Sequence, residues 1–180
     1  LLKTAGSALQ NIQGDLGRIR ELSVQASNGI YTADDRKNIQ FEISSLLENI
    51  QSSVKNTEFN TMKLLDGTFS DKNLGAGANG QGKIMSLENT SLESLGLDGF
   101  SVEGDFNIED IDKAISKVSE SLSNIGAQSN AFQTNINSSR VSELNQTSAK
   151  SALADIDIAK AVIELNKQKS LDQYKIALQN

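Results

Sequence analysis

Apolar residues recur at alternating spacings of three and four along the first 26 residues of the chain. Residues at this spacing fall on one face of a helix, and a run of almost four heptads is typical of coiled-coil packing. Ser23 interrupts the series once, and Leu22 lies off it. The pattern predicts a long helix that packs against another helix. Its apolar face comprises Leu2, Ala5, Leu9, Ile12, Leu16, Ile19 and Ala26.

A turn and a second helix are predicted to follow. Asn28-Gly29 is expected to end the first helix, with Gly29 as a left-handed cap. Thr32 is the expected N-cap of the second helix, because Asp34 and Asp35 then fall in its first turn, where the helix dipole favours negative charge. The connection is short, so the two helices are expected to be antiparallel neighbours. The second apolar face comprises Ile39, Ile43, Leu46, Leu47, Ile50 and Val54.

The hydrophobic period changes between residues 59 and 106, a segment that holds eight of the 13 glycines. Short alternating runs at Lys63–Phe69, Lys83–Leu87 and Gly99–Val102 indicate small strands or hairpins. The glycines between residues 75 and 80 lack the spacing and the Lys-Ser/Thr pair of a phosphate-binding loop. This segment is therefore expected to form a minor sheet and turns.

A third helix is predicted over residues 107–142, capped by Asn107 or Asp105. The heptad spacing falters at Arg140–Thr147, and a last amphipathic segment follows. The apolar residues of that segment have few partners inside the chain, so part of its face is expected to pack elsewhere. The third helix carries Ile108, Ile111, Ile115, Val118, Leu122, Ile125, Phe132 and Ile136, and the last segment carries Ala152, Ile156, Ala159, Ile163, Leu171, Tyr174 and Leu178.

Together these elements predict a mainly α fold. The expected architecture is an elongated rod of long antiparallel helices, similar to a coiled-coil bundle, with a small β-hairpin insert at one end. Residues 1–58 would form an antiparallel helix pair, and residues 59–106 the hairpin and turn region of the same domain. Residues 107–142 would form the long C-terminal rod helix, and residues 143–180 a linker and the start of a last helix.

The composition argues against several classes of function. Because the chain has no Cys and no His, the common zinc, iron and copper ligand sets and the Ser-His-Asp and Cys-His catalytic arrangements are missing. A net charge of −6 argues against nucleic-acid binding, which usually needs a basic surface. No apolar run approaches the roughly 18 residues of a membrane helix. We therefore expect no catalysis, cofactor, nucleic-acid binding or membrane insertion.

Four aspartates are candidate metal ligands: Asp34, Asp35, Asp155 and Asp157. Their spacing does not match an EF-hand loop. The first pair is better explained by the start of a helix, and the second pair by ordinary solvated charge. The sequence therefore predicts no metal site.

Several segments match, in order, the pattern of one known family. The N-terminal part contains RIRELSVQASNG at 18–29, DDR at 34–36, IQFEI at 39–43 and EFNTMKLLDG at 58–67. The rest contains LGAGANGQGKI at 74–84, SLGLDGFSV at 94–102, and two helical stretches at 108–136 and 151–179. No single motif is diagnostic, but the ordered set resembles bacterial flagellin, in particular the rod domain next to the filament core.

The resemblance implies a self-assembling structural subunit of the bacterial flagellar filament, active in motility. Implied partners are other flagellin subunits, the flagellin export chaperone and the host Toll-like receptor 5. The implied location is extracellular, in the filament, after export through the flagellar type III apparatus. Most of the family's terminal core helices are missing, so this fragment is expected to be monomeric. No large variable outer domain is present, and residues 137–150 fit the family pattern less well.

The same resemblance implies a receptor-binding surface. Many flagellins bind Toll-like receptor 5 through residues that match Arg18, Leu22 and Glu42. In such a surface Arg18 offers a planar donor fork, Leu22 fills a small apolar pocket, and Glu42 completes the patch from the antiparallel helix. Arg20 and Gln25 are further candidates. The alternative reading is that these are solvated helix-face charges and one exposed leucine, both of which are common.

A hook–filament junction protein is the alternative identity, because that class shares the RELxxQ-like stretch at 20–25 and the general helical plan. The LGLDG stretch at 95–99 and the C-terminal helix resemble flagellin more closely. Some flagellins carry a metallopeptidase insert, but its HExxH motif requires histidine, which this chain lacks.

Overall fold

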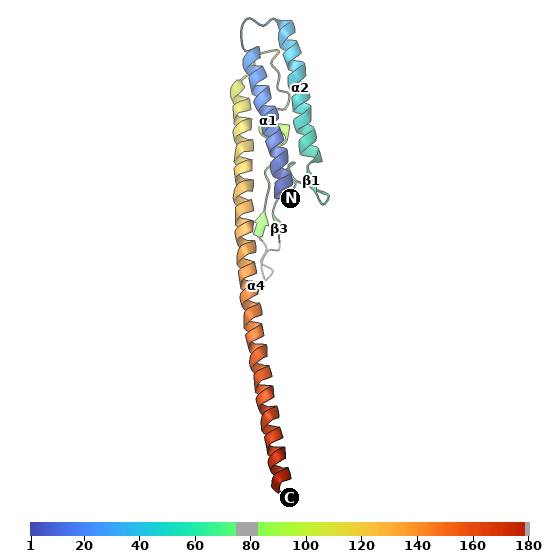
Figure 1. Ribbon diagram of the computed structural model, residues 1–180. Helices are drawn as coiled ribbons and strands as arrows, with labels where there is room; N and C mark the ends of the chain where they lie inside the picture. Colours follow the sequence, from blue (N-terminus) through green and yellow to red (C-terminus); the bar gives the residue numbers. More distant parts are fainter. Residues whose placement is uncertain (75–82, 179–180) are drawn as a thin grey trace. The chain divides into compact units, whose positions relative to one another are not determined.

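The computed structural model describes residues 1–74 and 83–178. It divides into two compact units, residues 1–133 and 134–180, which are described separately below. The expected mainly α architecture with small hairpins is confirmed (Figure 1). In chain order the elements are α1 (Leu2–Ala26), α2 (Ala33–Asn56), β1 (Glu58–Phe59), β2 (Met62–Lys63), β3 (Lys72–Leu74), β4 (Lys83–Met85), α3 (Leu92–Leu95) and α4 (Ile108–Leu178).

The core of the first unit lies between α1, α2 and the first part of α4. Helices α1 and α2 run side by side and antiparallel, as predicted (Figure 1). The predicted α1 face is buried from Ala5 to Ala26, and Ser23 fills the missing heptad position because its hydroxyl donates to the Ile19 carbonyl at 2.8 Å. On α2 every predicted face residue is buried except Leu46, which is half-buried.

The turn between these helices confirms one expected cap and corrects the other. Thr32 caps α2 in a reciprocal capping box: its hydroxyl accepts from the Asp35 N–H at 3.2 Å, and the Asp35 carboxylate accepts from the Thr32 N–H at 3.0 Å. The prediction of a left-handed cap at Gly29 was wrong. Ser27 ends α1 in a right-handed conformation, and its hydroxyl donates to the Val24 carbonyl. Gly29 is not among the described glycines with positive φ.

The segment between α2 and α4 contains less strand than predicted. Two antiparallel pairs form, β1 with β2 and β3 with β4. The strand predicted at Lys83–Leu87 is confirmed over Lys83–Met85, whereas Lys63–Phe69 is strand only at its first residue and Gly99–Val102 is not a strand. A short helix, α3, was missed.

The alternating runs did not predict strands correctly, because their apolar residues are buried but their backbones have no partner strand. Leu65 and Phe69 lie in the core, while their carbonyls accept from Thr90 and Leu87 N–H groups at 2.9 Å each. The segment turns at Gly67, where φ is +86° and an added Cβ would lie 3.0 Å from the Asn89 Cβ. Single long-range backbone bonds therefore replace the ladder that the alternation predicted.

Helix α4 begins as predicted, because the Asn107 side chain accepts from the Glu109 N–H at 3.0 Å. Its buried face is rotated from the prediction: small residues, Ala114 and Ser121, lie in the core, while Ile115 and Leu122 are half-buried. The heptad spacing falters at Arg140–Thr147, but helix α4 continues through this stretch to Leu178. The fully buried or nearly buried positions are Ile111, Ala114, Val118, Ser121 and Ile125.

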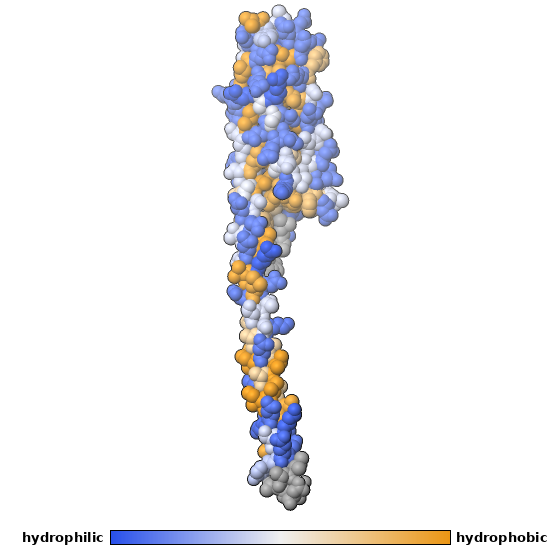
Figure 2. Space-filling view, viewed as in Figure 1, coloured by the Kyte–Doolittle hydropathy of each residue, from blue (hydrophilic) through white to orange (hydrophobic). Residues whose placement is uncertain are grey.

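The second unit consists of the later part of α4. Every side chain from residue 134 to residue 175 is exposed. Figure 2 shows large apolar side chains gathered along this segment. They are Ile136, Val141, Leu144, Leu153, Ile156, Ile158, Val162, Ile163, Leu165, Leu171 and Tyr174. The apolar face of the last predicted segment is therefore open to solvent over the residues whose side chains are described.

Candidate functional site

The surface where α1 meets α2 brings two predicted site residues together. Glu42 Oε1 lies 2.9 Å from both Nε and Nη2 of Arg18. Arg18 Nη1 also donates to Glu21 Oε2 at 3.1 Å, within α1. One cation thus lies between two carboxylates. The Arg18 side chain is 51% exposed and the Glu42 side chain 48% exposed, so the group stays open to a partner.

The electrostatics of this group follow from its contacts. The hydrogen bonds from Arg18 to Glu42 and to Glu21 raise the pKa of the Arg18 guanidinium above its ordinary value. Arginine is charged at any physiological pH in any case. The group therefore presents a permanent cation whose orientation is fixed by partners on two helices.

Leu22 does not share the exposure predicted for it. Its side chain is only 3% exposed, and it belongs to the hydrophobic core. The heptad spacing of α1 describes a single apolar seam, and Leu22 lies off that seam. Helix α1 contacts both α2 and α4, so its buried face is wider than one seam. Leu22 thus lies beneath the surface on which Arg18 lies.

Arg20 and Gln25 lie apart from the Arg18 group. Arg20 Nε donates to Asp112 Oδ1 on α4 at 2.6 Å, and this hydrogen bond raises the pKa of Arg20. Gln25 Nε2 donates to the Tyr31 hydroxyl at 2.9 Å, at the turn before α2. The structure therefore pairs Arg18 with Glu42, whereas Arg20 and Gln25 each bind a different neighbour.

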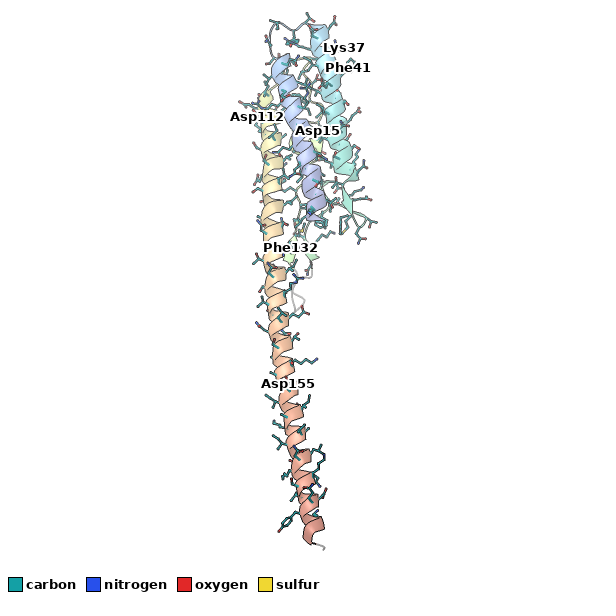
Figure 3. The ribbon with its side chains drawn as sticks, in the orientation of Figure 1. Asp15, Lys37, Phe41, Asp112, Phe132 and Asp155 are labelled. Atoms are coloured by element: carbon teal, nitrogen blue, oxygen red, sulfur yellow. The ribbon has the colours of Figure 1, made fainter. Side chains whose placement is uncertain are left out.

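Sequence reasoning missed Phe41, the residue before Glu42. Its side chain is 65% exposed on the outer surface of α2 (Figure 3). The signal was present in the sequence, because an aromatic residue stands outside the apolar face predicted for this helix. Aromatic residues, phenylalanine included, are enriched in protein interfaces.

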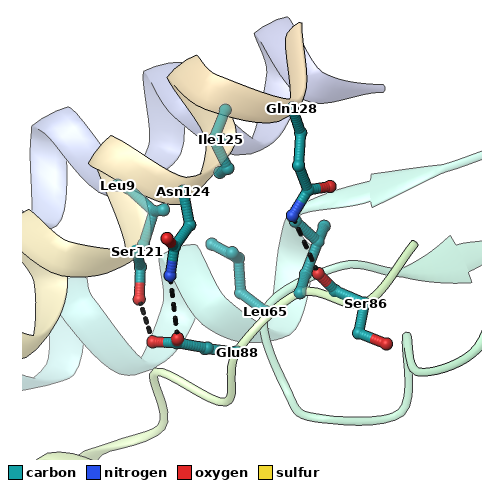
Figure 4. Close-up of a pocket in the computed structure, with 9 residues that line it drawn as sticks. Leu9, Leu65, Ser86, Glu88, Ser121, Asn124, Ile125 and Gln128 are labelled. Atoms are coloured by element: carbon teal, nitrogen blue, oxygen red, sulfur yellow. Dashed lines mark hydrogen bonds between the residues drawn. The ribbon is translucent and has the colours of Figure 1, made fainter. Parts of the chain in front are cut away.

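One partly enclosed cavity of the first unit is too small for a ligand. Its volume is about 40 Å³, whereas small-molecule sites usually span about 300–1,000 Å³. At its wall the Glu88 carboxylate accepts from the Ser121 hydroxyl at 2.6 Å and from the Asn124 amide at 3.2 Å (Figure 4). Gln128 lines the same cavity and donates to the Ser86 carbonyl at 3.5 Å. These contacts fasten the segment before α3 to α4.

The described residues contain neither a metal-binding cluster nor a membrane-spanning helix. Over residues 1–74 and 83–178, no cluster of three or more acidic, Cys or His side chains is arranged to hold a metal ion. No described helix is both long enough and apolar enough to span a membrane.

Comparisons with known proteins agree on one family. The bacterial flagellin N-terminal helical region matches residues 1–70, and the bacterial flagellin C-terminal helical region matches residues 108–179. The flagellin of Halalkalibacterium halodurans is 31% identical over 99% of this chain and 68% of its own length. The chain belongs to the bacterial flagellin family. A flagellar filament core protein of Treponema maltophilum is 30% identical over 94% of the chain and 67% of that protein.

A solved structure supports the same assignment. The crystal structure of Bacillus cereus flagellin matches 76% of this chain and 82% of its own, with a TM-score of 0.67 and 28% identity. This flagellin is therefore a structural component of the bacterial flagellar filament that self-assembles with other flagellin subunits. The family is structural, not enzymatic.

Proposed function

We propose that the α1–α2 surface of this flagellin, centred on Arg18 and Glu42, binds Toll-like receptor 5. The observation that carries the proposal is the Arg18–Glu42 pair, formed across two packed helices and half exposed on both sides. Helices are more precise supports than loops, so the guanidinium is presented in a fixed orientation. Phe41, the residue before Glu42, adds an exposed apolar group on the outer surface of α2.

The role of Leu22 in this proposal differs from that of the charged residues. A side chain that is 3% exposed offers almost no area to a receptor. Leu22 lies one helical turn after Arg18. We infer that its burial in the core holds this turn of α1, and so Arg18, in position. Arg18, Glu42 and Phe41 make the receptor contacts.

Binding of the chain to the receptor ectodomain tests this proposal. Arg18→Ala and Phe41→Ala are expected to weaken binding at least tenfold, about 1.4 kcal/mol. Lys3→Ala is the matched control, because it removes an exposed cation from the same helix. The double exchange Arg18→Glu with Glu42→Arg keeps an ion pair but reverses its direction. If the exchanged chain binds like the wild type, the pair is only a structural brace and the proposal is wrong.

We also propose that the open apolar face of the second unit contacts other flagellin subunits in the filament. The exposed face includes Ile156 and Ile163, which are one heptad apart. Apolar residues at this spacing can pack against a second helix as in a coiled coil. The test is incorporation of the chain into growing flagellin filaments, measured by sedimentation. Ile156→Asp with Ile163→Asp should reduce incorporation, while Asn166→Asp, which also adds negative charge, should not. Equal incorporation of all three chains would refute this use of the face.

The cellular route is part of the same proposal. We infer export through the flagellar type III apparatus, with an export chaperone acting on the C-terminal segment, and an extracellular place in the filament. The absence of Cys fits a chain that is exported unfolded and needs no disulfides. The test is the appearance of the chain in the medium of flagellated cells and its retention in cells that lack the export apparatus.

A further inference from the structure

Three asparagines of the first unit make the same local turn. In each, the side-chain Oδ1 accepts a hydrogen bond from the backbone N–H two residues later. The donors are Ile30 for Asn28 at 3.3 Å, Ser91 for Asn89 at 2.9 Å and Glu109 for Asn107 at 3.0 Å. Such a turn curls the side chain back over the peptide that follows it. The carboxamide carbon therefore lies beside the next backbone nitrogen in all three.

What differs is the residue that supplies that nitrogen. Thr90, after Asn89, is fully buried, β-branched, and its N–H donates to the Leu65 carbonyl at 2.9 Å. Ile108, after Asn107, is β-branched and opens α4. Gly29, after Asn28, has no side chain, is exposed, and its N–H donates no hydrogen bond within the described part of the chain. Only at Asn28 is the nitrogen both unhindered and unengaged.

We propose that Asn28 is a site of spontaneous deamidation. The Gly29 nitrogen loses its proton to solvent base and attacks the Asn28 Cγ. The new carbon–nitrogen bond closes a five-membered succinimide, and ammonia leaves with the former amide nitrogen. Water then opens the ring at either carbonyl, giving aspartate or isoaspartate at position 28. No oxidant, enzyme or metal is required.

The turn assists this reaction as well as permitting it. Negative charge develops on Asn28 Oδ1 when the ring closes, and the Ile30 N–H already donates to that oxygen. A donor held in place at a developing oxyanion lowers the barrier. The product places a new negative charge just beyond the C-terminal end of α1, where the helix dipole disfavours it. Isoaspartate also lengthens the backbone of the turn that joins α1 to α2.

The experiment is incubation of the folded chain in mildly alkaline buffer, followed by tryptic peptide mass spectrometry. The peptide from 21 to 36 isolates Asn28, and Asn89 falls in another peptide as an internal control. We expect conversion at Asn28 to be at least about tenfold faster than at Asn89. The second Asn-Gly pair, at 79–80, lies outside the described residues and in a third peptide, so it does not contribute.

Gly29→Ala is the matched variant. The position does not have positive φ, and an added Cβ meets nothing within 4 Å, so the fold is retained. We expect this change to slow conversion at least about tenfold. A denatured sample completes the design: unfolding should speed Asn89 but not Asn28. Equal rates at Asn28 and Asn89, no effect of Gly29→Ala, or strong protection of Asn28 by folding would each overturn the proposal.

Discussion

Arg18 and Glu42 lie on different helices, and Arg18 Nε donates to Glu42 Oε1 at 2.9 Å. The two strongest candidates for a receptor contact are thus each other's partner in the free chain. A receptor carboxylate or carbonyl would have to join this pair or replace one member. Both side chains are half exposed, so solvent screens their attraction.

This exposure gives the first prediction. Arg18→Ala should leave the urea midpoint of unfolding almost unchanged, because exposed ion pairs contribute little to stability. Glu42→Gln should behave in the same way. Measuring unfolding and receptor binding on the same samples separates the two roles. A large drop in the midpoint for Arg18→Ala would mean that the pair is a structural element, and any loss of binding would then need another explanation.

Leu22 gives the second prediction, and Val24 is its control. Leu22→Ala should lower the free energy of unfolding by about 2–5 kcal/mol, because it removes buried side-chain atoms from a packed core. Val24, two residues later on the same helix, is 46% exposed, so Val24→Ala should stay within about 0.5 kcal/mol. Similar effects of the two changes, measured by urea unfolding, would contradict the burial of Leu22.

These residues also show what sequence can and cannot predict. The long helices and the Thr32 cap follow from local periodicity and local hydrogen bonding, and both were predicted. The burial of Leu22 depends on a second neighbour for α1, which a single seam does not reveal. The Arg18–Glu42 pair depends on the register of two helices, and no local pattern encodes that. The rotated face of α4 has the same origin, since small residues such as Ala114 allow close approach.

The strands show a different limit. Alternation of apolar and polar residues predicted strands at Lys63–Phe69 and Gly99–Val102, but alternation reports burial on one side, not a strand partner. Around Val102 the partner is a side chain of α2. Gln40 Oε1 accepts from the Val102 N–H at 2.8 Å, and Gln40 Nε2 donates to the Phe100 carbonyl at 3.3 Å. One amide thus replaces the neighbouring strand.

Gln40 therefore gives the third prediction. Gln40→Ala should lower the free energy of unfolding by about 1–3 kcal/mol, because it leaves the N–H of the fully buried Val102 without its partner. Gln51→Ala, an exposed position on the same helix, should stay within about 0.5 kcal/mol. Hydrogen exchange at the Val102 amide should speed up only in Gln40→Ala. If the hydrogen-exchange rate of the Val102 amide were unchanged in Gln40→Ala, the hydrogen bond from Val102 to Gln40 would not be formed.

The capping box at the start of α2 gives the fourth prediction, on pH. Hydrogen bonds from the Thr32 hydroxyl and N–H lower the pKa of Asp35 below its ordinary value of 3.8. A carboxyl whose pKa is lower in the folded chain adds stability above the unfolded value and loses it as the pH falls through the folded value. Thr32→Ala should cost about 1 kcal/mol near neutral pH. Its deficit relative to the wild type should shrink below pH 3.8.

Asp15 supplies a control of opposite sign for that experiment. Burial raises the pKa of Asp15 above 3.8, so its charged form is less favourable in the folded chain than in the unfolded chain. Asp15 therefore opposes folding once the pH rises through its folded value. Asp15→Asn should stabilise the chain near neutral pH, with a gain that vanishes in acid. Urea unfolding at both pH extremes measures the two effects together. If the free energy of unfolding changed with pH in the same way for the wild type, Thr32→Ala and Asp15→Asn, both assignments would be contradicted. Neither carboxyl would then have a different pKa in the folded and unfolded chains.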